Sequence, residues 1–351
     1  MWLGINRLLN RGRKKQGTIF LEENGLISDP LQVANKFNNY YLNIADKLCE
    51  KIPKVNNKFQ DYLKNPNKNK LTLNETTPDE ILKVINNLDG KKSGDIFSIS
   101  PDLVKLSGQV IAQILTIIFN VSIHDGCFPS EMKVAKILPM HKGDSVLSVG
   151  NYRPISLLPI FSKIFERLIY NRLIEFITDN KILSELQFGF QKNKSTEHAV
   201  TSILSTLDEA KSKRNSSYCI FLDFAKAFDT VNHEILLAKL DHYGISGVSH
   251  TLLKSYLSNR TQQTEINGVL SDTGIIKHGV PQGSVLGPLL FLLYINDISE
   301  SSKVLKFFLF ADDTTVYYSD KTNSGTEDLL NRELSKVSVW LAANKLRLNV
   351  K

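Results

Sequence analysis

Two short apolar runs in this chain each end abruptly in aspartate. Residues 218–222 lead into Asp223, and residues 307–311 lead into Asp312 and Asp313, after which β-branched and aromatic residues resume. A carboxylate is expensive to remove from water, so each run is expected to be a buried strand whose end meets solvent or a ligand. An acidic dipeptide between two such runs predicts a hairpin. The fold must therefore include short strands that carry acids at their ends.

Helical patterns flank these strands. Residues 160–178 and 327–346 each place apolar side chains on one stripe with helical spacing. A further helix is predicted to start at Thr77, where Pro78 occupies the first helical position and Glu80 completes a capping box. Residues 134–139 and 152–158 resemble a further pair of strands. The mixture of helices and short strands predicts an α+β fold.

Composition excludes several classes of protein. With 351 residues, 42% hydrophobic and 23% charged, the chain is typical of a soluble globular protein. Its longest apolar stretch, residues 285–295, is far shorter than the ~18–20 residues that a membrane span needs. Early arginines argue against a secretion signal, and three widely spaced cysteines argue against a disulfide framework or a cysteine zinc site. We expect an intracellular, reducing location and no membrane partner.

Positive charge is concentrated in two segments. Residues 1–70 hold 13 Lys/Arg and 6 Asp/Glu, which accounts for the whole net charge of +7. Residues 132–194 hold 10 basic and 5 acidic side chains. Such an excess is typical of proteins that bind phosphate-rich partners, but a lysine-rich surface that only aids solubility gives the same pattern.

The two predicted strands that end in aspartate suggest a metal site if they are neighbours. Asp223, Asp312 and Asp313 would then converge, and their mutual repulsion would require cations. Carboxylate oxygens suit Mg²⁺, and two metal ions are the known arrangement for phosphoryl transfer by polymerases and nucleases. The alternative is that strand ends are simply where solvent begins and where aspartate makes turns.

Five ordered blocks of sequence resemble motifs of reverse transcriptases. They are residues 137–144 (ILPMHKGD) with 151–156 (NYRPIS), 187–196 (QFGFQKNKST), 220–229 (IFLDFAKAFD), 279–288 (GVPQGSVLGP) and 310–314 (FADDT). Together they cover roughly residues 130–351. The pattern is similar to the polymerases of non-long-terminal-repeat retrotransposons of the LINE type, jockey-like. An intron maturase or a telomerase is the alternative lineage, and the last two blocks argue against both.

The resemblance implies roles for the acids and their neighbours. Asp223 and Asp312 would ligate two Mg²⁺ ions, and Asp313 would support the site. The nucleotide would be bound by Lys142, Arg153, Phe224, Ala225, Phe228 and Gln282. In this set the planar guanidinium of Arg153 suits triphosphate oxygens, and the ring of Phe228 would exclude a ribose 2′-hydroxyl. Phe228 as an ordinary core residue is the alternative. Template and primer would lie against Gly279, Pro281 and Gly283, where glycine permits close approach.

The resemblance also implies an architecture and a function. We expect a right-hand polymerase with fingers and palm, a small antiparallel palm sheet backed by helices such as 160–178 and 327–346, and no thumb. Residues 1–130 would form a basic, mostly helical extension, and residues 131–351 the reverse transcriptase domain. It would extend a DNA primer with dNTPs on an RNA template. The alternative is a catalytically silent, nucleic-acid-binding remnant of a decayed element.

The C-terminus resembles the opening of a further motif. Residues 346–351 (LRLNVK) match its beginning, and the lysine that relatives place there would fall beyond Lys351. General acid assistance of this kind is worth ~10²–10⁴-fold in rate. We therefore expect weak and distributive extension.

Overall fold

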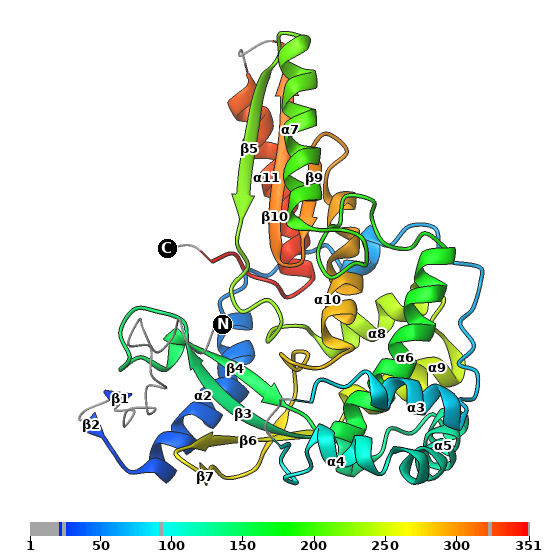
Figure 1. Cartoon of the computed structure of the whole chain (residues 1–351). Helices are drawn as coiled ribbons and strands as arrows, with labels where there is room; N and C mark the ends of the chain where they lie inside the picture. The colour runs from blue at the N-terminus through cyan, green and yellow to red at the C-terminus, as the bar shows by residue number, and fades with distance from the viewer. Residues whose placement is uncertain (1–20, 23–25, 91–93, 322–324, 350–351) are drawn as a thin grey trace, which may run out of the picture.

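The protein is a mixed assembly of helices and two larger sheets (Figure 1), as the sequence predicts. The computed structural model describes residues 21–22, 26–90, 94–321 and 325–349. The helices are α2 (Pro30–Cys49), α3 (Pro78–Asn86), α4 (Pro101–Leu106), α5 (Gly108–Asp125), α6 (Ile160–Asp179), α7 (Thr196–Ser212), α8 (His233–His242), α9 (Gly247–Leu257), α10 (Gly287–Ile295) and α11 (Thr326–Ala343). Short 3₁₀ turns are η1 (Phe59–Tyr62), η2 (Ser130–Lys133), η3 (Val149–Asn151) and η4 (Asn296–Ser301).

Within the described ranges, the strands form three separate sheets. They are β1 (Leu21–Glu22), β2 (Leu26–Ile27), β3 (Val134–His141), β4 (Tyr152–Leu157), β5 (Ser216–Leu222), β6 (Arg260–Ile266), β7 (Val269–Leu270), β8 (Gly274–Ile276), β9 (Lys306–Phe310) and β10 (Asp313–Asp320). Among the described residues, β1 and β2 pair only with each other. In the part of the chain that the structure describes, no helix is both long enough and apolar enough to cross a membrane.

The two apolar runs that precede Asp223 and Asp312 lie in one three-stranded antiparallel sheet of order β5-β10-β9. β9 and β10 form the predicted hairpin, with Phe310 opposite Asp313. β10 then pairs along the whole of β5, from Leu222 opposite Thr314 to Ser216 opposite Asp320. Both predictions, the hairpin and the antiparallel neighbours, are confirmed.

Helices cover both faces of this sheet (Figure 1). On one face, Phe308 and Tyr317 pack with side chains of α7 such as Ala210 and Leu207. On the other face, Phe307 and other strand residues join a large core that includes Trp340 of α11. The helix predicted at 160–178 exists as α6, but it packs against α3 and η2 instead of this sheet. The helices that cover the sheet are α7 and α11, because apolar side chains on its two faces pack against them.

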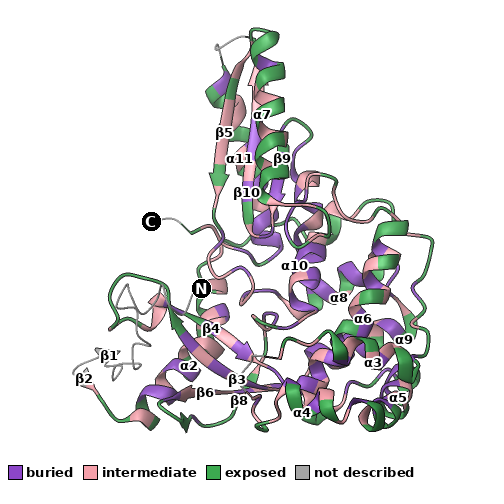
Figure 2. Ribbon diagram, in the orientation of Figure 1, coloured by how far each residue is buried: buried purple, intermediate pink, exposed green. Residues whose placement is uncertain are grey.

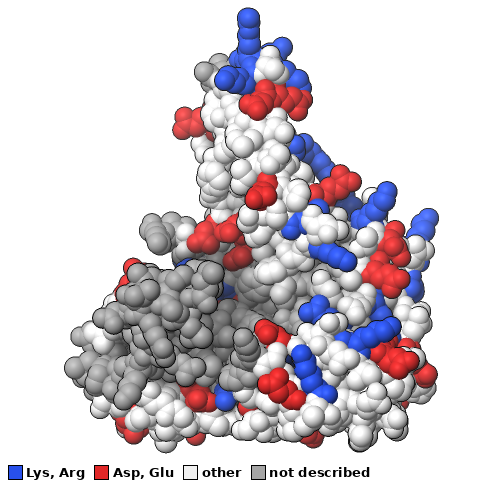
Figure 3. Space-filling view, viewed as in Figure 1, with Lys and Arg blue, Asp and Glu red and all other residues white. Residues whose placement is uncertain are grey.

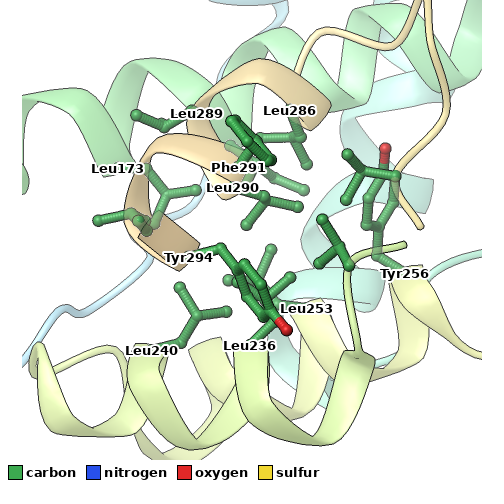
Figure 4. Packing of buried hydrophobic residues seen from close by; sticks show 14 of the residues in the cluster. Leu173, Leu236, Leu240, Leu253, Tyr256, Leu286, Leu289, Leu290, Phe291 and Tyr294 are labelled. Carbon is green, nitrogen blue, oxygen red and sulfur yellow. The ribbon is translucent and has the colours of Figure 1, made fainter. Parts of the chain in front are cut away.

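The main core is built around α10, which has the sequence GPLLFLLYI. A helix that is apolar on every side must be surrounded, and Figure 2 shows α10 as buried. Its side chains interdigitate with leucines of α8 and α9 such as Leu236, Leu240 and Leu253 (Figure 4). Ile81, Phe119 and Phe165 belong to the same cluster, so residues from both sides of position 130 share one core.

The second large sheet has the order β4-β3-β6-β7, with β8 also paired to β6. β3 and β4 pair with each other, as predicted, and are antiparallel, whereas β3 and β6 are parallel. Helix α2 lies across this sheet and buries Phe37 against Tyr152, with ring centroids 5.0 Å apart. Asn38 of α2 accepts a hydrogen bond from Gln262 of β6 at 3.0 Å.

The predicted start of α3 is correct at its cap. The Thr77 hydroxyl accepts a hydrogen bond from the backbone N–H of Glu80 at 3.3 Å. The second half of the predicted capping box is wrong, because the Glu80 carboxylate instead pairs with the guanidinium of Arg172 on α6 at 2.8 Å. This ion pair joins α3 to α6, a contact that local sequence does not encode.

Candidate active site

The three predicted carboxylates lie at one end of the three-stranded sheet. Asp223 directly follows Leu222, whose partner across the sheet is Thr314, the residue after Asp313. Asp312 occupies the turn between β9 and β10. Asp223 and Asp313 are exposed and Asp312 is half-buried. Figure 3 shows acidic side chains on the visible face at the end of the sheet where β5 finishes.

Like charges surround Asp312. Burial raises the pKa of its carboxyl group above the usual value, and the nearby carboxylates of Asp313 and Asp223 raise it further. A hydrogen bond with the backbone and the guanidinium of Arg153 act in the opposite direction. The ionised form of Asp312 is thus disfavoured by burial and by its two carboxylate neighbours more than the backbone and Arg153 favour it. A cation bound at this end of the sheet would reduce that repulsion.

The donor chemistry fits a divalent metal, since carboxylate oxygens are the ligands that Mg²⁺ and Mn²⁺ prefer. However, among the described residues no group of three or more His, Cys, Asp or Glu side chains stands close enough to hold a metal ion. One oxygen of Asp223 instead accepts a hydrogen bond from the side-chain amide of Asn349 at 2.7 Å. The sequence prediction gave Asn349 no role, although it lies within residues 346–351, the segment that resembles the opening of a further motif.

The turn that carries Asp312 is braced by Gln187. The Gln187 side-chain oxygen accepts hydrogen bonds from the backbone N–H groups of Ala311 at 3.1 Å and Gly189 at 2.8 Å. Ala311 has a φ of +56°, a left-handed conformation that costs a non-glycine residue roughly 1–2 kcal/mol. Phe188 also donates its N–H to Leu309 of β9 at 2.7 Å. The block at 187–190 therefore supports the acidic turn, a role that the sequence prediction did not assign.

The β3–β4 hairpin carries Arg153, whose guanidinium acts on Asp312. Arg153 lies on β4 opposite Met140, and Lys142 closes the hairpin by donating its N–H to Asn151 at 2.8 Å. Both side chains are exposed. Lys226, which the prediction missed, joins them and donates from Nζ to the carbonyl of Gly150 at 3.2 Å.

Charged groups of both signs act on the ammonium group of Lys226. Burial lowers the pKa of its ammonium group, and the positive charges of Lys142 and Arg153 lower it further, whereas Asp229 raises it. The positive charges of Lys142, Arg153 and Lys226 are therefore near one another, and Arg153 also acts on Asp312. Such a group of cations suits an anion with several oxygens such as a triphosphate.

The sequence left two interpretations open for Phe228, a nucleotide contact and an ordinary core residue. Its ring stacks on Phe291 of α10, with centroids 4.4 Å apart, and meets the edge of Phe190 at 6.1 Å. The residue is nevertheless only half-buried. Phe224 differs, because its side chain is buried in the main core. Ala225 donates its backbone N–H to Arg347 at 2.8 Å.

Gln282 is engaged with Asp229. The side-chain amide of Gln282 donates a hydrogen bond to the Asp229 carboxylate at 2.8 Å, and its backbone carbonyl accepts one from the N–H of Ser156 on β4 at 2.8 Å. Burial raises the pKa of Asp229 to about 6, although Gln282 and Lys226 act against this rise. The side-chain amide of Gln282, which was predicted to contact the nucleotide, is thus engaged within the protein.

The glycines of the 279–288 block serve protein packing. Gly279 has a φ of +84°, and a Cβ there would meet the carbonyl oxygens of Asp229 and Phe228 at 2.8 and 2.9 Å. At Gly283 a Cβ would lie 2.6 Å from the Ser156 carbonyl oxygen. Pro281 is half-buried and its carbonyl accepts from Ser284 at 3.1 Å. The close approach that requires glycine is therefore between backbone segments, and contact with template or primer stays a prediction.

Other predicted features lie partly outside the described residues. Lys351 is one of them, as are residues 1–20 and 23–25 of the basic segment 1–70.

Comparison with known proteins gives a consistent result. Residues 140–351 match the family described as reverse transcriptase (RNA-dependent DNA polymerase). The chain is 32% identical over 304 residues to a probable RNA-directed DNA polymerase from transposon BS of Drosophila melanogaster, which covers 82% of this chain and 33% of that protein. It is 31% identical over 312 residues to the RNA-directed DNA polymerase from mobile element jockey of the same organism, covering 87% of this chain and 33% of that protein. The chain thus spans about a third of the length of these curated relatives.

Proposed function

The chain belongs to the reverse transcriptase family, and on this premise we propose that it is an RNA-directed DNA polymerase that extends a primer with deoxynucleotides during retrotransposon replication. The observation that carries the proposal is the convergence of Asp223 with the Asp312–Asp313 turn at one end of a three-stranded sheet. We assign this sheet as the palm and the sheet of β3, β4 and β6 as part of the fingers.

The acids would hold two Mg²⁺ ions. Asp223 and Asp312 would supply the ligating oxygens, with Asp313 beside them, because these side chains come from adjacent strand ends. When bound, such ions lower the pKa of a primer 3′-hydroxyl and neutralise charge on a triphosphate. The half-buried position of Asp312 favours this role, since a carboxylate partly removed from water attracts a cation more strongly than an exposed one.

The neighbouring residues would bind and orient the nucleotide. Arg153 and Lys142 project from the β3–β4 hairpin, and Lys226 supports them from the turn after β5. Their positive charges would meet triphosphate oxygens while the ring of Phe228 lies under the sugar. Nucleic acid template, primer and dNTPs are the partners that this arrangement requires, and RNA is the proposed natural template.

Primer extension on an RNA template with Mg²⁺ tests the proposal. We expect the chain to add dNTPs and Asp312→Ala to abolish addition without lowering the melting temperature, because removing one of several like charges does not cost stability. Asp320→Ala is the matched control, since Asp320 lies opposite Ser216 at the far end of β10, the strand that follows Asp312. If the unmodified chain binds nucleic acid but adds no nucleotide under any divalent metal, it is the silent remnant instead.

A further inference from the structure

A short segment after α11 runs antiparallel to the residues that follow β5. Leu348 forms a bridge with Phe224, and the carbonyl of Arg347 accepts the N–H of Ala225 at 2.8 Å. Asn349 then contacts Asp223 twice: its backbone N–H donates to the Asp223 carbonyl at 2.8 Å, and its side-chain amide donates to Oδ2 at 2.7 Å. The backbone pairing therefore fixes the amide of Asn349 directly beside the first carboxylate.

The position of this segment is set by a buried turn. Asn344 is fully buried, donates its amide to the carbonyl of Trp340 at 2.9 Å, and accepts the hydroxyl of Tyr294 at its own carbonyl. Leu346 is only 2% exposed and donates its N–H to Leu341 at 2.9 Å. Because these anchors lie in the main core, the register of residues 347–349 against residues 223–225 is fixed by the fold.

We propose that Asn349 is a positioning residue that orients the carboxylate of Asp223 for cation binding, an inference that rests on the proposed function. Asp223 is exposed, so without a partner its carboxylate would rotate freely. The amide holds Oδ2 and leaves Oδ1 available as a ligand. A neutral donor suits this task, because it orients the carboxylate without neutralising the charge that attracts the cation. Partners of this kind typically contribute roughly 10–100-fold to metal affinity.

Direct measurement of Mn²⁺ binding by electron paramagnetic resonance tests the proposal independently of catalysis. We expect Asn349→Ala to weaken Mn²⁺ binding roughly 10–100-fold relative to the unmodified chain. Asn331→Ala is the matched control, since Asn331 is an exposed asparagine near the start of α11, and this variant should bind Mn²⁺ normally. Leu348→Ala loosens the packing of the same segment but keeps the amide, and should have the smaller effect. Asp223→Ala should abolish binding at this site.

Primer extension across a metal titration provides the second measurement. Because Asn349→Ala keeps every ligand, we expect its rate to recover at high Mn²⁺, whereas Asp223→Ala should stay inactive at any concentration. Unchanged Mn²⁺ affinity in Asn349→Ala, with loss of binding in Asp223→Ala, would overturn the positioning role and leave the proposed function intact. Equal binding by Asp223→Ala and the unmodified chain would overturn the metal site and this inference with it.

Discussion

Replacing Asp229 by asparagine should make the protein more stable at neutral pH. Asp229 lies in the turn after β5, receives a hydrogen bond from Gln282 at 2.8 Å, and is half-buried. Burial raises its pKa from 3.8 to about 6, with Gln282 and Lys226 opposing the rise. Asparagine has nearly the same shape and keeps an oxygen that can accept the Gln282 hydrogen bond. The substitution therefore removes the cost of ionisation and little else.

The sign and size follow from linkage. Between pH 3.8 and about 6 the folded protein holds a proton on Asp229 that the unfolded chain has released, so stability falls as pH rises. The contribution of the protonated group is complete below pH 3.8 and is lost above about pH 6. At ~1.36 kcal/mol per pKa unit the whole loss is ~3 kcal/mol. Partial solvent exposure screens the charge, so we expect Asp229→Asn to gain about 1.5 kcal/mol at about pH 7.5.

Urea unfolding at several values between about pH 5 and pH 8 measures this effect. The gain of Asp229→Asn over the unmodified chain should grow with pH and level off above about pH 6. Asp208→Asn, at an exposed position on α7, provides the control and should show no such growth. A destabilised Asp229→Asn above neutral pH, or a difference that does not change with pH, would refute the argument that burial opposes ionisation here.

Three further predictions concern sugar selection, nucleic-acid affinity and the core. Phe228→Ala should raise ribonucleotide relative to deoxyribonucleotide incorporation by roughly 10-fold or more in single-nucleotide extension; an unchanged ratio would mean that Phe228 only packs on Phe291. Deleting residues 1–20, which carry five basic and no acidic side chains, should make RNA affinity less sensitive to salt. In a filter-binding series, the slope of log affinity against log salt should fall by about 0.7 for each RNA phosphate that these residues neutralise. Asp297→Asn should lower the free energy of unfolding by about 3–5 kcal/mol, because the buried ammonium of Lys239 would lose the carboxylate that pairs with it. Calorimetric or urea unfolding that shows a decrease of less than ~1 kcal/mol would contradict that reasoning.

Local patterns in the sequence determined the elements that carry the chemistry. The apolar runs before Asp223 and Asp312 predicted two strand ends and a hairpin, and β5, β9 and β10 confirm them. The stripe at 160–178 predicted α6 to within one residue, and the Thr77 cap predicted the start of α3. These features depend on residues a few positions apart, whose alternation, helical spacing and capping chemistry are visible in the chain itself. The two-domain division, the missing thumb and the location in the cell remain predictions.

How those elements support the site depends on contacts between distant parts of the chain. The brace from Gln187 to the acidic turn and the hydrogen bond from Asn349 to Asp223 join residues 124 and 126 positions apart. Lys226 became part of the cationic group only because β5 ends beside the β3–β4 hairpin. α6 was assigned to the wrong neighbour, since an apolar stripe shows that a helix is covered but not by what. Contacts between distant segments depend on packing and on the pairing of buried polar groups, and no local periodicity encodes either of them.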